Sequence, residues 1–210
     1  MIRNPRDLKR YSVSERVNHW VVGISFILLA LSGLAFFHPA FYPLTQLFGG
    51  GTWTRILHPW IGVIMALAFF IMAVRFAGLN LIGKADIEWL KRAGEMIDGD
   101  DHNMPAQGKY NGGQKLLFWG LVIGMLVIAV SGVLMWRSMV AVPTPVVRLA
   151  SLAHACAAVF MILLIIVHVY AAIWTRGTIR AMWYGTVTRA WAKQHHRTWY
   201  EQVTGDRNNN

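Results

Sequence analysis

Four long apolar segments constrain the fold of this chain more than any other feature. They run from about Trp20 to Phe37, from about Trp60 to Phe76, from about Leu116 to Trp136 and from about Leu149 to Trp174. A helix of about 17–25 apolar residues crosses the hydrocarbon core of a bilayer, and no segment alternates polar and apolar residues as a strand would. The sequence therefore predicts an all-α membrane protein, a single domain over residues 1–210 built as a four-transmembrane-helix bundle in membrane lipid.

The composition supports a membrane protein and argues against several other classes. Hydrophobic residues make up 55% of the chain and charged residues only 14%, whereas about 25% of a soluble domain is charged. A net charge of +10 suits basic loops beside membrane spans, so we expect no nucleic-acid partner. The one cysteine, Cys156, excludes a disulfide framework and an iron–sulfur cluster held by this chain.

The distribution of lysine and arginine predicts the orientation in the membrane. Of these 20 residues, only Arg55, Arg137 and Arg148 flank the spans on one side. All the others lie in the N-terminal tail, in or beside the loop from Asn80 to Lys115, or in the C-terminal tail. Because basic residues concentrate on the cytoplasmic side, we predict that both termini are cytoplasmic.

Two polar segments outside the spans carry weaker patterns. The loop predicts a short amphipathic helix around Asp86 to Met96, followed by an acidic turn at residues 98–101. The C-terminal stretch from Thr178 to Trp199 alternates basic residues with tryptophans. This pattern is typical of an interfacial helix, and a solvated basic helix is the equal alternative.

Histidines are the residues most suited to carry chemistry. Four of the eight, His19, His58, His154 and His168, lie within a span or at its edge, where ionisable residues are costly and usually mark function. The other four are expected at the surface: His38, His102, His195 and His196.

The spacing of the intramembrane histidines predicts two cofactor sites at different depths. His154 and His168 are close to four helical turns apart, so they share a face and are separated by about 21 Å along the axis. One metal ion cannot use both, but two stacked haems can. The predicted topology then matches His58 with His154 near the outer surface and His19 with His168 near the inner surface. Each pair would supply two axial imidazoles to one haem iron.

Small residues follow each of these histidines at the position four residues later. They are Gly23, Gly62, Ala158 and Ala172. Residues at i and i+4 share a helix face, so these positions would leave room for a flat macrocycle. Helix packing is the alternative explanation, because small residues are common in membrane helices, as in Gly120-x-x-x-Gly124.

Several longer motifs match one known family. They are Ser14-Glu15-Arg16-Val17-Asn18-His19-Trp20, Leu57-His58-Pro59 with Gly62, Tyr110-Asn111-Gly112-Gly113-Gln114-Lys115, Ser131-Gly132-Val133, Val167-His168-Val169-Tyr170-Ala171-Ala172, and the ending Ala190-Trp191-Ala192-Lys193 with His195-His196 and Trp199-Tyr200. Together they resemble the gamma subunit of membrane-bound respiratory formate dehydrogenase, a di-haem cytochrome b. The resemblance covers the chain from about Tyr11 to Tyr200.

The resemblance implies an electron-transfer subunit of the bacterial inner membrane, active in anaerobic respiration. In that family a periplasmic subunit with a molybdenum or tungsten cofactor oxidises formate, and an iron–sulfur subunit passes the electrons to the outer of two b haems. The electrons reach a quinone, here expected to be menaquinone, near the cytoplasmic face. Carried onto this chain, the family points to Asn111, Gly113 and Gln114 for the quinone, so this chain would reduce quinone without oxidising formate.

Two other functions are compatible with the residues. One is the cytochrome b subunit of a hydrogenase or of another periplasmic oxidoreductase, in which the electron path is the same and the substrate differs. The other is a non-redox membrane anchor or transporter, in which the histidines only bond to backbone.

Overall fold

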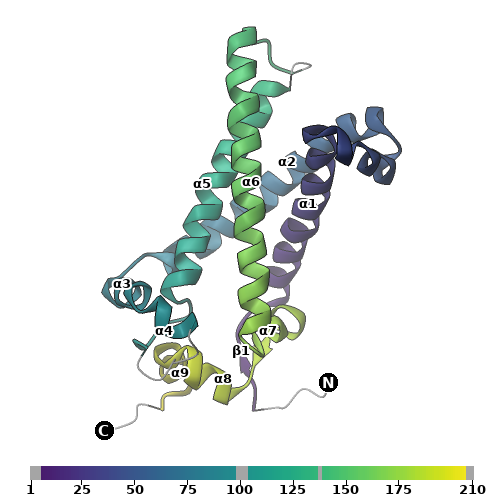
Figure 1. Ribbon diagram of the computed structural model, residues 1–210. Coiled ribbons are helices and arrows are strands. Elements are labelled where there is room, and N and C mark those ends of the chain that lie inside the picture. The colour runs from purple at the N-terminus through teal and green to yellow at the C-terminus, as the bar shows by residue number, and fades with distance from the viewer. Residues whose placement is uncertain (1–5, 98–103, 137–138, 207–210) are drawn as a thin grey trace. The chain divides into compact units, whose positions relative to one another are not determined.

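The computed structural model describes residues 6–97, 104–136 and 139–206. Four of its helices are long and apolar enough to cross a membrane. They are α1 (Val13–Phe37), α2 (Gly51–Phe76), α5 (Gly112–Met135) and α6 (Thr144–Trp174), the long ribbons of Figure 1. The prediction of an all-α protein with four membrane spans is therefore confirmed, and the chain is a multi-pass membrane protein.

The predicted spans end where the helices end but begin too late. The helices start at Val13, Gly51, Gly112 and Thr144 rather than near Trp20, Trp60, Leu116 and Leu149. The first turns of α1 and α5 are polar, so hydropathy does not detect them, yet they are helical because side chains cap them. In α1, the backbone N–H of Ser12 donates to Glu15 and that of Glu15 donates to the Ser12 hydroxyl. This is a capping box, which satisfies donors that the helix itself leaves unpaired.

The connection from α1 to α2 is a 3-10 helix, η1 (Pro39–Phe48), followed by two glycines with positive φ. His38 caps η1 by accepting a hydrogen bond from the N–H of Ala40. Gly49 and Gly50 turn the chain back in the left-handed region, which residues with a side chain rarely adopt. His38 therefore has a structural role.

The chain divides into two compact units, each built from segments far apart in the sequence. We call Val17–Val74 with Gly120–Val167 the bundle unit, and Met1–Arg16, Arg75–Trp119 with His168–Asn210 the terminal unit. That residues 1–210 act as one domain remains a prediction.

The core of the bundle unit is small and rich in methionine. It consists of Met65, Phe69, Met125 and Met161, with partly buried neighbours from α1, α2 and α5. A Cβ on Gly124 would lie 2.5 Å from the sulfur of Met161, and one on Gly120 would lie 3.1 Å from a methyl carbon of Leu164. The Gly120-x-x-x-Gly124 motif therefore serves close packing of α5 against α6 within this chain.

The terminal unit contains a two-stranded antiparallel sheet and short helices. Strand β1 (Leu8–Lys9) pairs with β2 (Thr186–Val187). The helices are η2 (Ala77–Asn80), α3 (Lys84–Lys91), α4 (Ala93–Ile97), α7 (Thr178–Tyr184), α8 (Arg189–His195) and α9 (Arg197–Thr204). The amphipathic helix predicted around Asp86 to Met96 is two helices, and the acidic turn at 98–101 lies outside the described residues.

The stretch from Thr178 to Trp199 is not one continuous helix, as both the interfacial and the solvated alternatives assumed, because it contains α7, β2, α8 and the start of α9. Gly185 ends α7 with φ 77°, and its carbonyl accepts hydrogen bonds from the N–H groups of Arg10 and Tyr11. Trp191 and Trp199 pack into the core of the unit. These two tryptophans therefore hold the C-terminal helices together.

Candidate functional site

His58 of α2 and His154 of α6 face each other in the bundle unit, as the depth argument predicts. Their ring centres are 6.3 Å apart and the ring planes are inclined by 63°. A metal–imidazole bond is about 2.0–2.1 Å long and the ring centre is about 1 Å beyond the nitrogen, so two rings on opposite sides of one ion have centres about 6 Å apart. The pair therefore has the separation of two axial ligands of one iron.

The chemistry of the donor set also fits a haem better than a bare metal ion. No group of three or more His, Cys, Asp or Glu side chains that could hold a metal is found among the described residues. A structural or catalytic zinc site needs at least three such ligands, whereas a haem iron takes four nitrogens from its own ring and two from the protein.

Two of the glycines that follow a histidine by four residues have open space beside them, which leaves room for a flat cofactor. A Cβ added to Gly23 would meet no atom within 4 Å, and one added to Gly62 would meet only a methyl carbon of Leu29 at 4.0 Å. These two glycines are therefore not required by packing of the chain on itself. This contrasts with Gly124, whose Cβ would clash with Met161.

Two serines that the sequence analysis did not single out as site residues contact the histidines of this pair. The hydroxyl of Ser32 is 2.7 Å from Nδ1 of His58, and that of Ser131 is 3.0 Å from Nδ1 of His154. Each serine is followed by a glycine in a similar local sequence, Ala-Leu-Ser-Gly-Leu at 30–34 and Ala-Val-Ser-Gly-Val at 129–133. The signal that could have found them is this recurrence, one helix before each histidine.

His19 and His168 lie where the sequence places them, on α1 and α6, and both are half-buried. The ring of His19 contacts that of Trp20 edge to face, with centres 5.7 Å apart. The two histidines belong to different compact units, so their pairing remains a prediction.

The predicted quinone residues form the N-terminal cap of α5. The N–H of Asn111 donates to the side-chain oxygen of Gln114 at 3.1 Å, and the N–H of Gln114 donates to that of Asn111 at 2.9 Å. The glycines between them allow close packing on α3, since a Cβ on Gly113 would lie 3.0 Å from the ring of Trp89. The side-chain oxygens of Asn111 and Gln114 thus accept hydrogen bonds within the cap. Their amide NH2 groups are the candidate donors to a ligand.

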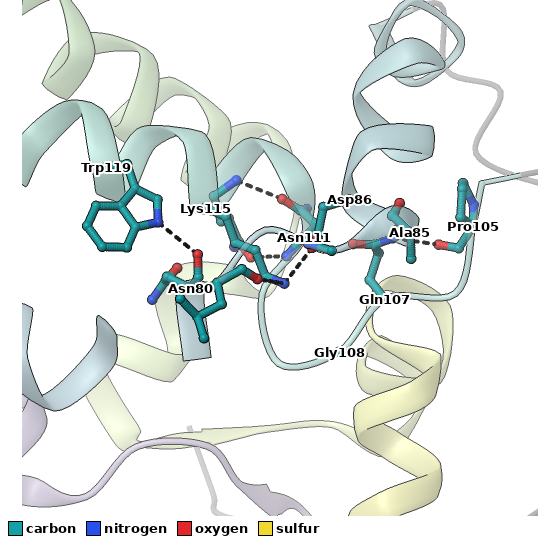
Figure 2. A network of polar contacts seen from close by, with 12 residues as sticks. Asn80, Ala85, Asp86, Pro105, Gln107, Gly108, Asn111, Lys115 and Trp119 are labelled. Atoms are coloured by element: carbon teal, nitrogen blue, oxygen red, sulfur yellow. Dashed lines mark hydrogen bonds and ion pairs between the residues drawn. The ribbon is translucent and has the colours of Figure 1, made fainter. Parts of the chain in front are cut away.

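Further polar contacts fix the start of α5 to the preceding segment (Figure 2). The ammonium of Lys115 is 2.7 Å from the carboxylate of Asp86 and also donates to the carbonyl of Leu81. The indole N–H of Trp119 donates to the carbonyl of Asn80 at 2.9 Å. Both partners of the ion pair are largely buried, so the cap of α5 has little freedom to move.

The expectation that His196 lies at the surface is wrong, since its side chain is 2% exposed. Its Nδ1–H donates to the carbonyl of Gly108 at 2.8 Å, and its Nε2 accepts from Arg10 at 3.1 Å. Burial and the Arg10 charge lower the pKa of His196 to about 3, so it is neutral at physiological pH. His102 lies outside the described residues.

Burial and neighbouring charges also affect the pKa values of other side chains in the terminal unit. The guanidinium carbon of Arg10 lies 4.9 Å from the ring centre of Trp191 and 4.9 Å from that of Trp199. Burial lowers the pKa of Lys109, with Arg10 and Arg75 acting in the same direction. Burial raises the pKa of Tyr110, which therefore keeps its proton at physiological pH.

Four membrane-spanning helices with two facing imidazoles define the class of membrane cytochromes b. The family model for prokaryotic cytochrome b561 matches residues 10–185, and the chain belongs to this family. Membership implies haem b as the cofactor.

Named relatives are similar over nearly the whole chain. The cytochrome b556(fdo) subunit of formate dehydrogenase from Escherichia coli strain K12 is 45% identical, with 92% of each chain covered. The nitrate-inducible cytochrome b556(Fdn) subunit from the same strain is 43% identical, covering 90% of this chain and 88% of the relative. The formate dehydrogenase cytochrome b556 subunit of Haemophilus influenzae is 38% identical, covering 96% and 85%. The resemblance to the cytochrome b subunit of formate dehydrogenase is thereby confirmed.

Proposed function

We propose that this chain is the membrane cytochrome b subunit of a respiratory formate dehydrogenase. It would pass electrons from a periplasmic module, made of an iron–sulfur subunit and a molybdenum or tungsten catalytic subunit, to a quinone at the cytoplasmic side. The observation that carries the proposal is the pair His58 and His154, whose ring centres are 6.3 Å apart inside a membrane helical unit. The names of the relatives supply formate as the substrate of the catalytic partner.

The four intramembrane histidines are assigned to two b haems. His58 and His154 would hold the outer haem, and His19 and His168 the inner one. When bound, haem iron supplies one-electron transfer. The chain itself contributes the imidazole ligands, the apolar surroundings and the spacing in depth between the two histidines of α6.

The orientation and location complete the proposal. With both termini cytoplasmic, α6 begins on the periplasmic side, so His154 is nearer the electron source and His168 nearer the quinone. The protein would lie in the bacterial inner membrane as a single membrane domain. Its charge bias supports this orientation, because only three basic residues flank the spans on the other side.

The quinone site is proposed at the capped start of α5. The amide NH2 groups of Asn111 and Gln114 would donate to a quinone oxygen, and Gly113 lies between them at the packed contact with Trp89. Menaquinone is the expected quinone. Proton uptake on the cytoplasmic side, with electrons arriving from outside, would move charge across the membrane and store energy in the potential.

The test of the overall function is purification of the intact complex through a tag on this chain. We expect a reduced-minus-oxidised spectrum of b haem, reduction of that haem by formate, and a co-purifying molybdenum or tungsten subunit. A hydrogenase large subunit in its place would overturn formate as the substrate of the complex. A complex without haem would overturn electron transfer as the function of this chain.

The quinone site is tested with variants that keep the cap. Asn111→Asp and Gln114→Glu retain the oxygens that accept the backbone N–H groups but remove the NH2 donors, and acidic groups are favoured at a helix N-terminus. We expect normal haem reduction by formate and slow haem reoxidation by quinone. Parent-like reoxidation in both variants and in Asn111→Leu would place the quinone elsewhere.

The orientation is tested by labelling single cysteines after Cys156 is replaced by serine. Cysteine at Lys84 or Arg189 should be protected from an impermeant thiol reagent in cells with a permeabilised outer membrane, and cysteine at Trp53 or Arg148 should react. The opposite pattern would reverse the topology and exchange the two haem assignments.

A further inference from the structure

The hydrogen bonds between the two serines and the histidines of the outer pair have similar geometry. The hydroxyl oxygen of Ser32 lies 2.7 Å from the carbonyl oxygen of Leu28 and 2.7 Å from Nδ1 of His58. The hydroxyl oxygen of Ser131 lies 2.6 Å from the carbonyl oxygen of Val127 and 3.0 Å from Nδ1 of His154. In each case the serine lies on the helix before that of the histidine, within the bundle unit.

The number of protons fixes the direction of these bonds. A serine hydroxyl has one hydrogen, and a carbonyl oxygen can only accept. The 2.6–2.7 Å distances to Val127 and Leu28 are those of an O–H···O bond, so the serine hydrogen points to the carbonyl. The serine oxygen then accepts a hydrogen from Nδ1 of the histidine, and for His154 the backbone carbonyl of Ile128 is a second acceptor. The tautomer that results carries its proton on Nδ1 and leaves the lone pair of Nε2 for a metal.

The glycine after each serine lies beside the histidine ring. A Cβ on Gly33 would lie 3.4 Å from Cε1 of His58, and a Cβ on Gly132 would lie 3.5 Å from Cε1 of His154. The ring edge therefore already lies at van der Waals distance from the place of a side chain. An alanine would therefore still fit at either position, and only a larger side chain would push against the ring that the serine orients.

We propose that Ser32 and Ser131 are positioning residues that fix the tautomer and ring plane of the two outer haem ligands and lower the reduction potential of that haem. A hydrogen bond to Nδ1–H raises the basicity of the imidazole. A more basic ligand stabilises ferric over ferrous iron. The proposal rests on the assignment of His58 and His154 as ligands.

The experiment separates the hydrogen bond from the volume of the side chain. Ser32→Ala and Ser131→Ala remove the acceptor, whereas Ser32→Cys and Ser131→Cys keep nearly the same volume with sulfur, a weak acceptor. Ser25→Ala is the matched control, because Ser25 is buried on the same helix two turns before Ser32. All variants are made in the intact complex.

We expect the midpoint potential of the outer haem to rise in the Ala and the Cys variants and to stay unchanged in Ser25→Ala. A single variant should change the ratio of oxidised to reduced haem at fixed potential about threefold, and the double variant about tenfold, which for one electron is about 59 mV. The low-spin ferric EPR spectrum should change as well, because it reports the angle between the two imidazole planes.

The outcomes distinguish this proposal from the one on which it rests. Unchanged potential and EPR spectrum in the double Ala variant, with full haem content, would overturn the role of the serines and leave the haem assignment intact. Potentials restored by cysteine would also overturn it, because volume would then be the cause. Full outer haem in His58→Ala would instead overturn the assignment of the ligands.

Discussion

The bundle unit and the terminal unit use polar side chains in opposite ways. In the bundle unit, large apolar side chains such as Ile24, Leu67 and Phe70 are more than half exposed, as suits contact with lipid. Its buried polar groups are few hydroxyls, and two of them contact histidines, as Ser32 does with His58. The terminal unit instead contains buried charged groups, including Arg10 and Asp86.

The difference follows from the backbone that each unit has to stabilise. Long helices satisfy their own hydrogen bonds, so a membrane helix needs no further polar partners. A polar contact between two long helices of the bundle unit is therefore a signal of chemistry, in contrast to the cap of His38 in the connection between α1 and α2. The terminal unit consists of short helices, a two-residue sheet and loops, whose free N–H and C=O groups need side-chain partners. There, a buried polar group is most often structural. A histidine inside the bundle unit is therefore a candidate ligand, whereas a buried histidine in the terminal unit is a structural residue.

The largest effect is expected from removing a histidine that is proposed to bind haem and comparing it with the removal of a structural histidine. His58→Ala or His154→Ala should abolish the outer haem, because one axial ligand is lost, and leave the inner haem. His196→Ala, in the terminal unit, should leave the haem content unchanged although it removes a ring that is more deeply buried than either. Haem per chain is measured by the pyridine haemochrome assay on the purified complex.

This comparison fails in either of two ways. Full haem content after both substitutions in the bundle unit would show that the facing rings do not hold iron. Loss of one haem in His196→Ala, in a complex that is otherwise assembled, would show that the terminal unit also takes part in cofactor binding.

The second effect concerns the buried ion pair of Lys115 with Asp86. Lys115→Met leaves the Asp86 carboxylate buried without its ammonium, which costs about 3–5 kcal/mol. We expect faster amide hydrogen exchange over α3 and the first turns of α5. Lys91→Met is the control, because Lys91 is exposed and such changes stay within about 0.5 kcal/mol. Equal exchange in the two variants would show that the pair does not hold the start of α5.

How far the sequence predicts this molecule also differs between the two units. Apolar length predicted all four spans and their C-terminal ends, and depth matching paired His58 with His154, whose ring centres are 6.3 Å apart in the structure. Pattern did not reveal the role of Ser32, because a hydroxyl inside an apolar helix resembles a packing residue until its partner is placed.

In the terminal unit, pattern predicted less. The fold there depends on contacts between distant segments, such as β1 with β2 and Arg10 with His196, and local periodicity carries no information about them. The helical starts of the spans were missed for a related reason: a capping box such as that of Ser12 and Glu15 extends a helix through polar residues.

A smaller effect is expected in the methionine core of the bundle unit. The added Cβ of Gly124→Ala would lie 2.5 Å from the sulfur of Met161, a side chain that is 1% exposed. Overpacking of this kind costs about 1–3 kcal/mol, so the thermal stability of the complex in detergent should fall. Adding Met161→Val, which removes the clashing sulfur, should recover part of the loss. A double variant less stable than either single one would show that these two side chains do not meet.

The smallest effect is the pH dependence contributed by His196. Its pKa is lowered to about 3 in the folded chain by burial and by Arg10, with His195 adding to the same direction, whereas an unfolded histidine has a pKa of about 6.5. Below pH 6.5 the unfolded chain binds a proton that the folded chain excludes, so the free energy of unfolding falls as pH falls toward 3. The slope is at most about 1.4 kcal/mol per pH unit, and the loss at pH 6 is below about 1 kcal/mol. His196→Gln can donate to Gly108 and accept from Arg10 but does not titrate. We therefore expect the melting temperature of the parent complex to fall more than that of His196→Gln between pH 7 and pH 5, and identical curves would show that His196 is not buried in its neutral form.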